Sequence, residues 1–151
     1  MRDDLGIEVP LLGRPARIVS LVPSLTEALA VDHRDQLVGV TDWCTHPGDL
    51  DVARVRGTKN PNVAQIVELA PDVVIANKEE NRELDVRRLR EAGVAVWVTD
   101  IESVDESFSS MRRLWAECLD APIPGWLIEA EAIWAEPVTL EARKVACCIW
   151  R

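Results

Sequence analysis

A short apolar strand that runs directly into a proline and then a helix start is the feature that most constrains the fold of this chain. Residues 18–22 are largely apolar and β-branched, as expected of a parallel strand buried on both faces. Pro23 ends the strand, and Ser24 and Glu27 have the spacing of a capping box, so we expect a helix to begin at Ser24. Ligands of open α/β sheets bind beyond such strand ends, near free helix N–H groups. The junction therefore predicts an α/β fold and a candidate ligand site, with an ordinary strand-to-helix turn as the alternative.

Strand patterns and helix patterns alternate along the rest of the chain. The predicted strands cover residues 17–22, 37–40, 73–76 and 94–98. The predicted helices begin at Ser24, after Asn62 and at Ser103, and one more covers residues 80–92 with Gly93 as its carboxyl cap. Residues 5–9 are expected to pair as a hairpin with Leu11 and Leu12. The alternation predicts a parallel sheet with helices packed against it.

The chain changes character after residue 121. Two prolines and a glycine within residues 121–125 predict a corner, because they cannot continue a helix. A helical pattern follows over residues 125–136, and residues 144–150 have the pattern of a buried strand. A strand of this apolarity needs an element that covers it. The pattern therefore predicts one lobe followed by the first strand of another.

Length and charge limit the classes of protein that the chain can belong to. Its 151 residues suffice for one domain with a real core. With 17 basic and 26 acidic residues, the net charge of -9 argues against a nucleic-acid surface. No apolar run approaches the roughly 20 residues that span a bilayer. The start, Met1 to Asp4, is not followed by an apolar signal core, so we expect the chain as written to stay in the cytoplasm.

The four cysteines do not indicate a structural zinc site or a disulfide framework. Cys44, Cys118, Cys147 and Cys148 lack the paired spacing of a structural zinc site. We expect Cys118 and at least one of Cys147 and Cys148 to be small core residues in a reducing compartment.

The tryptophans divide into expected core residues and one candidate for function. Trp97, Trp115 and Trp134 lie within apolar patterns and are expected to pack, whereas Trp43 lies in a predicted loop. His33 stands among charged residues, which predicts a solvated position on the surface.

Four ordered motifs resemble a known family. They are RIVSLVPSLTE at residues 17–27, LVGVTDWCTHP at 37–47, GTKNPN at 57–62 and ELAPDVVIANKEEN at 68–81. In this order they resemble the helical-backbone metal receptors, the substrate-binding proteins of ABC importers for vitamin B12, haem and ferric siderophores. The cobalamin-binding branch is the most similar. The resemblance implies two α/β lobes joined by one long helix, with the ligand in the cleft between them and little domain closure.

This resemblance also assigns roles to segments of the chain. Residues 1–121 would form an amino-terminal parallel-sheet αβα lobe, residues 122–143 the region of the connecting helix, and residues 144–151 the first strand of an incomplete second lobe. The implied ligand is a corrinoid such as cobalamin, or a similar metal chelate such as haem or a ferric siderophore. The implied partner is an ABC permease, and the family is usually periplasmic or on the cell surface. No intrinsic cofactor and no catalytic residue is expected.

The same resemblance places the cleft wall in the loops that follow successive strands. The candidate ligand contacts are Pro23 and Ser24 in the first loop; Trp43, Cys44 and His46 in the second; Thr58, Lys59 and Asn60 in the third; and Asn77 and Lys78 in the fourth. These positions share the carboxyl edge of the predicted sheet. Trp43 is the best candidate for a stacking wall, because large planar ligands bind through apolar area and a few placed polar groups. Cys44 and His46, beside Asp42, are an alternative pair of metal donors, although two donors do not complete a site.

Three features depart from the family pattern. The chain begins without an export signal or lipid anchor, and residues 29–35 lack the glycine that generally ends the first helix. Ala64 and Gln65 stand where importer-bound members usually present a docking carboxylate. These departures keep open a different class, a cytoplasmic regulatory or partner-binding protein or a small enzyme that is no longer coupled to an importer. No nucleophile elbow, phosphate-binding glycine loop or dinucleotide fingerprint supports an enzyme.

Overall fold

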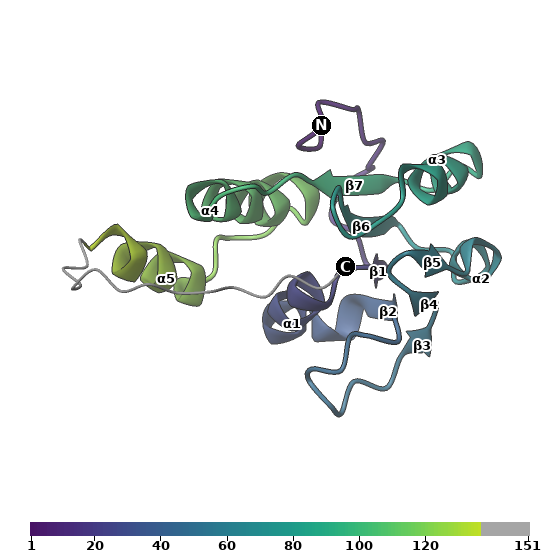
Figure 1. Cartoon of the computed structure of the whole chain (residues 1–151), viewed down its shortest axis with the longest axis horizontal. Helices are drawn as coiled ribbons and strands as arrows, with labels where there is room; N and C mark the ends of the chain where they lie inside the picture. The colour runs from purple at the N-terminus through teal and green to yellow at the C-terminus, as the bar shows by residue number, and fades with distance from the viewer. Residues whose placement is uncertain (137–151) are drawn as a thin grey trace, which may run out of the picture.

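The centre of the fold is a parallel five-stranded sheet with helices on both faces (Figure 1). The computed structural model describes residues 1–136. The strand order is β3 (Ala53–Arg54), β2 (Leu37–Val40), β1 (Ile18–Ser20), β6 (Val73–Asn77) and β7 (Val96–Thr99). Every neighbouring pair is parallel. The predicted α/β class is confirmed, and the strand of the opening junction lies at the centre of the sheet.

The helices and a small hairpin complete the described part of the chain. The helical elements are α1 (Pro23–Asp32), η1 (Arg34–Gln36), α2 (Val63–Glu68), α3 (Glu83–Glu91), α4 (Val104–Arg113), the π-helical turn η2 (Leu114–Cys118) and α5 (Gly125–Ala135). Strands β4 (Arg56–Gly57) and β5 (Asn60–Pro61) form an antiparallel hairpin. None of the helices within residues 1–136 has the length and apolar character that crossing a membrane requires.

Alternate residues of the strands belong to two separate hydrophobic cores, one on each face of the sheet. Ile18 and Trp97 face α1 and α4 in a cluster that also contains Trp115. Val19 packs on the other face in a cluster with Ile66 of α2 and residues of α3. Because both faces are covered, the central strands are apolar throughout instead of alternating. The predicted core positions of Trp97, Trp115 and Cys118 are confirmed.

The two predicted capping boxes have different outcomes. Ser103 caps α4, and its Oγ accepts a hydrogen bond from the backbone N–H of Glu106 at 3.2 Å. The prediction that Ser24 begins the first helix is wrong, because α1 begins at Pro23 and Val22 is its N-cap, without a side-chain cap. Pro23 lacks an N–H group and has the φ of a first helical residue, so it moves the helix start ahead of Ser24.

The ends of the other helices follow the predicted signals more closely. Asn62 Oδ1 caps α2 by accepting a hydrogen bond from the backbone N–H of Gln65 at 3.3 Å. Gly93 follows α3 with a φ of 81°, a conformation that favours glycine. The helix predicted over residues 80–92 begins only at Glu83. The corner predicted within residues 121–125 separates η2 from α5.

Three other predictions are wrong. The amino-terminal segment forms a single bridge between Arg2 and Glu8 instead of a hairpin with residues 11–12. His33 is only 4% exposed, because its ring packs 5.9 Å from that of Trp115. His33 also closes the end of α1, where no glycine is present. Its backbone N–H donates a hydrogen bond to a carbonyl oxygen of α1, and its Nδ1 lies 2.5 Å from the carboxamide oxygen of Gln36. Trp134 is 66% exposed on α5 and is not a core residue.

The predicted strand at residues 144–150, with Cys147 and Cys148, lies outside the described residues. The boundaries at residues 121 and 143 therefore stay predictions.

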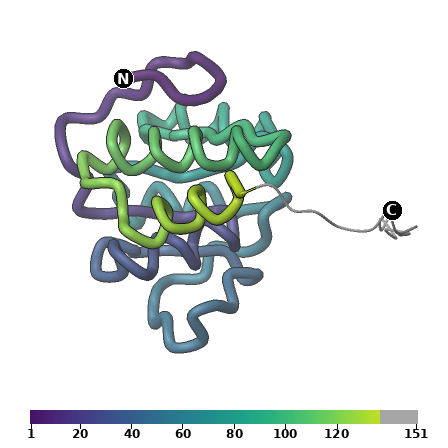
Figure 2. The backbone as a smooth tube through the Cα atoms, turned by 90° about the vertical axis from the view of Figure 1, so that its left-hand side faces the viewer, coloured from purple at the N-terminus to yellow at the C-terminus, as the bar shows by residue number. Residues whose placement is uncertain are grey.

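The amino-terminal segment is held against the edge strand β7 by buried carboxylates. One oxygen of Asp3 accepts two backbone N–H bonds from its own segment, and the other accepts a 2.7 Å bond from Arg90 of α3. The N–H of Asp4 donates to the carbonyl oxygen of Val98. Figure 2 shows this purple segment lying along one side of the molecule. The segment therefore covers a sheet edge that would otherwise be free to pair.

We expect Asp3→Ala to lower the free energy of unfolding by about 2 kcal/mol, because it removes three bonds to a buried charge at once. Urea unfolding monitored by circular dichroism measures this change. Asp51→Ala is the control, since Asp51 is exposed and should change stability by less than about 0.5 kcal/mol. Equal stability of the two variants would contradict the role of Asp3.

Candidate functional site

The predicted loops all leave the same edge of the sheet, which we call the rim. In a parallel sheet the carboxyl ends of the strands share one edge. Loops follow β1, β2 and β6 there, and the β4–β5 hairpin follows β3. The loop after β2 contacts the hairpin through a 2.8 Å bond from the N–H of Asp42 to the carbonyl oxygen of Arg56. The structure thus brings the loops that carry the candidate residues to one side of the molecule.

Asn81 joins three of these loops. Its Nδ2 donates to the carbonyl oxygens of Thr58 at 3.0 Å and Leu21 at 3.4 Å, and its Oδ1 accepts from the N–H of Asn77 at 2.9 Å. The side chain therefore connects the end of β1, the hairpin and the end of β6. Sequence reasoning missed this residue, which stands in the first turn of the helix predicted over residues 80–92. The one signal in the sequence that could have indicated Asn81 is its uncharged amide side chain shortly after a predicted strand.

Asn77 and Thr58 are buried beneath the rim and support its loops. The Nδ2 of Asn77 donates to Oγ1 and the carbonyl oxygen of Thr99 at 3.1 and 3.2 Å. Its Oδ1 accepts from two backbone N–H groups of the following turn. Both Asn77 and Thr58 are buried. Protein groups already use the polar atoms of the Asn77 side chain and the Thr58 carbonyl, which supports a structural role for both residues, and their direct contact with a ligand stays a prediction.

Cys44 is also a buried supporting residue, and its side chain does not line the rim. Its Sγ lies 3.1 Å from Oγ1 of both Thr26 and Thr41, which belong to α1 and the end of β2. The guanidinium of Arg54 donates to the carbonyl oxygens of Cys44 at 2.7 Å and Thr41 at 3.2 Å. A fully buried thiol cannot contact a ligand in the cleft, so this candidate is withdrawn.

The alternative metal site at Cys44 and His46 loses its thiol donor for the same reason. His46 is exposed, and its Nδ1 lies 3.1 Å from Oγ1 of Thr45. Within residues 1–136, no group of three or more His, Cys, Asp or Glu side chains is placed to hold a metal ion.

The other candidates reach the surface of the rim. Trp43 is 67% exposed, although tryptophan normally buries most of its area. The further candidates with exposed or half-buried positions are Pro23, Ser24, His46, Lys59, Asn60 and Lys78. The ammonium of Lys59 donates to the backbone carbonyl of Glu79, which adds a second link between the hairpin and the loop after β6.

Lys78 is held by acidic neighbours. Its Nζ lies 2.8 Å from Asp100 and 3.5 Å from Glu102. The hydrogen bond with Asp100, followed by the charges of both carboxylates, raises the pKa of Lys78 above its ordinary value. The rim at this end therefore presents a paired cation instead of a free positive charge.

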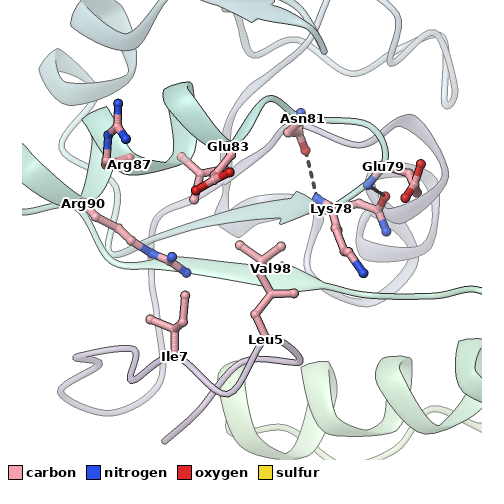
Figure 3. A pocket seen from close by; sticks show the side chains of 11 residues that line it. Leu5, Ile7, Lys78, Glu79, Asn81, Glu83, Arg87, Arg90 and Val98 are labelled. Carbon is pink, nitrogen blue, oxygen red and sulfur yellow. Dashed lines mark hydrogen bonds between the residues drawn. The ribbon is translucent and has the colours of Figure 1, made fainter.

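A cavity of about 640 Å³ lies beside the rim, between α3 and the amino-terminal segment (Figure 3). Its lining residues are Leu5, Ile7, Asn77, Lys78, Glu79, Asn81, Glu83, Val86, Arg87, Arg90 and Val98. It includes two candidate residues, Asn77 and Lys78, and does not include Trp43. The structure therefore divides the candidates between this side cavity and the part of the rim that carries Trp43.

Comparison with known proteins gives a consistent set of relatives. No family model matches the chain. The chain is 33% identical over 111 residues to the uncharacterised ABC transporter substrate-binding lipoprotein YvrC of Bacillus subtilis, which covers 71% of this chain and 35% of that protein. It is 31% identical over 115 residues to the vitamin B12-binding protein of Vibrio cholerae, covering 73% of this chain and 42% of that protein. A periplasmic haem-binding protein from Pseudomonas aeruginosa has the same fold, with a TM-score of 0.68 and 26% identity over 80% of this chain and 43% of its own.

The fold and these relatives define the class as an α/β lobe of a substrate-binding protein. The chain belongs to the family of ABC-importer substrate-binding proteins that includes the vitamin B12- and haem-binding proteins, which confirms the resemblance of its motifs. The chain spans 35% and 42% of the length of the two curated relatives described above. Its named relatives are binding proteins and not enzymes.

We expect Asn81→Ala to lower the free energy of unfolding by about 2 to 3 kcal/mol, because it leaves buried backbone groups of three loops without partners. Urea unfolding measures the loss, and hydrogen exchange should show faster exchange at the amide of Asn77. Asn60→Ala is the matched control, since Asn60 is exposed on the same rim. A loss no larger than that of the control would rule out Asn81 as the link between the loops.

Iodoacetamide should leave Cys44 and Cys118 unmodified in the native protein and modify both after unfolding. Both thiols are buried, and burial raises the pKa of Cys118 well above its ordinary value, which disfavours the reactive thiolate. Peptide mapping by mass spectrometry distinguishes these sites from the other cysteines. Rapid native alkylation of Cys44 would restore it as a residue of the cleft.

Proposed function

We propose that this chain supplies one wall of the binding site of a substrate-binding protein for a metal chelate, which is a corrinoid such as cobalamin, or a similar ligand such as haem or a ferric siderophore. The observation that carries this proposal is the exposed indole of Trp43 on the rim. The names of the relatives, vitamin B12-binding and haem-binding protein, support this ligand class. The alternative of a regulatory protein or a small enzyme has no comparable support.

The proposed mechanism is capture without chemistry. A flat macrocycle would stack on Trp43, and the exposed polar residues Ser24, His46, Lys59 and Asn60 would meet its edge. The buried bonds of Asn81, Asn77 and Cys44 hold the rim loops before a ligand arrives. Such preorganisation reduces the entropy that binding would otherwise cost.

The proposed partner is the permease of an ABC importer, as for the relatives that are ABC transporter substrate-binding proteins. Ala64 and Gln65 occupy the first turn of α2, so a docking salt bridge would have no carboxylate at these two positions. The proposed location follows the periplasmic and lipoprotein relatives and departs from the cytoplasmic location expected from the start of the sequence.

The proposed architecture keeps α5 as part of a connecting helix. Ile128, Ile133 and Trp134 of this helix are exposed large apolar residues. Their exposure supports contact between α5 and a further part of a longer protein.

Cyanocobalamin or haemin should quench the tryptophan fluorescence of this chain saturably and raise its melting temperature, because only a ligand of the folded state adds stability. One wall buries only part of a large ligand, so we expect weak binding, with Kd on the order of 10 μM or above. Trp43→Ala should weaken binding by about tenfold, which corresponds to roughly 1.4 kcal/mol of lost contact.

Trp134→Ala is the matched control, since Trp134 is equally exposed but lies on α5. N-acetyltryptophanamide at the same ligand concentrations corrects for light absorbed by the ligand. Equal affinity of the two variants would show that Trp43 is not part of the site. If neither cyanocobalamin nor haemin quenches the fluorescence saturably, the proposal is refuted for both ligands.

A further inference from the structure

Gly57 lies next to the Nε1 edge of the exposed tryptophan. A Cβ atom built on Gly57 would lie 3.2 Å from Nε1 of Trp43 and 2.6 Å from Oδ1 of Asn60. The first distance is shorter than nine in ten contacts that real Cβ atoms make, so the indole would have to move by a few tenths of an ångström, and the second requires the Asn60 side chain to move. Gly57 has no positive φ, so its backbone conformation is open to other residues. Space, and not backbone freedom, is therefore the reason for a glycine here.

One backbone bond joins the loop of Trp43 to this hairpin, and another fixes the loop internally. The N–H of Asp42 donates to the carbonyl oxygen of Arg56, the neighbour of Gly57, at 2.8 Å. The N–H of Thr45 donates to the carbonyl oxygen of Trp43 at 2.9 Å. With its backbone held on both sides, the indole meets the hairpin at its Nε1 edge and keeps 67% of the residue exposed.

We propose that Gly57 is a specificity-determining position, whose missing side chain lets Trp43 lie low against the hairpin and so leaves room above the ring for a flat ligand. This inference rests on the proposed function. A side chain at residue 57 would push the Nε1 edge of Trp43 and the carboxamide of Asn60 outward. The ring would then enter the space that a planar chelate needs, and the wall would no longer be flat.

The test is a series of substitutions, Gly57→Ala and Gly57→Val, with Gly48→Ala and Gly48→Val as matched controls. Gly48 lies in the loop after β2, and a Cβ there would meet only the carbonyl oxygen of Thr45, at an ordinary 3.8 Å. Valine is compatible with a strand, so the hairpin should still form, and far-ultraviolet circular dichroism verifies the fold. Gly57→Ala provides a milder displacement in the same direction if Gly57→Val does not fold.

The first measurement needs no ligand. The emission of Trp43 and its quenching by acrylamide are obtained as the difference between each variant and the same variant carrying Trp43→Phe. Gly57→Val should shift the emission of Trp43 and change its acrylamide quenching, and Gly57→Ala should do so less. The Gly48 variants should match the wild type. Unchanged Trp43 signals in both Gly57 variants would overturn the inference.

The second measurement is the affinity for cyanocobalamin and haemin. Gly57→Val should weaken binding by at least about tenfold, while the Gly48 variants keep the affinity of the wild type. Wild-type affinity in Gly57→Val despite a displaced ring would overturn the role in specificity. If the wild type binds neither probe, the proposed function fails and the role of Gly57 in specificity fails with it. The measurement without ligand still decides whether Gly57 positions Trp43.

Discussion

The hydrogen bonds of the Asn81 carboxamide are the interaction on which the candidate site depends. They join Asn81 to chain segments 60 and 23 residues away, at Leu21 and Thr58, and to Asn77 at the end of β6. The rim loops contribute few apolar residues to the two cores, so hydrophobic burial alone does not fix them. Leaving a buried amide without its hydrogen bonds costs more free energy than forming those bonds contributes. The arrangement of loops that satisfies all of them is therefore strongly favoured.

A repeated pairing of buried and exposed neighbours explains how a rim of loops presents a defined surface. Cys44 is buried and its neighbour Trp43 is exposed; Thr58 is buried beside the exposed Lys59; Asn77 is buried beside the exposed Lys78. In each pair the buried residue fixes the backbone, and the fixed backbone directs the exposed side chain. Under the proposed function, a substitution of a buried member would therefore change ligand binding through position, whereas a substitution of an exposed member would change it through contact.

The longer elements could be predicted from the sequence, because packing against a core requires a hydrophobic pattern along each of them. Strands β2 and β6 follow from apolar β-branched runs, while β3, β4 and β5 have two residues each and therefore no periodicity to detect. Identical capping spacings gave one correct helix start and one wrong one, because Pro23 outweighs Ser24. The loops of the site were predictable from the rule for strand ends. Which side chain of each loop is buried was not, because that depends on partners distant in sequence, such as Asn81 for Thr58 and Thr26 for Cys44.

Two lysines of the rim are held by contacts within the protein. Lys78 is paired with the carboxylate of Asp100, whereas the ammonium of Lys59 donates to the neutral carbonyl of Glu79 and keeps its positive charge. In the proposed site, the large exposed indole of Trp43 adds an apolar surface on which flat ligands of different chemistry can stack. Under the proposed function, selection among flat chelates therefore rests on two things. One is the height of the ring above Gly57, and the other is the set of polar side chains at the ligand edge.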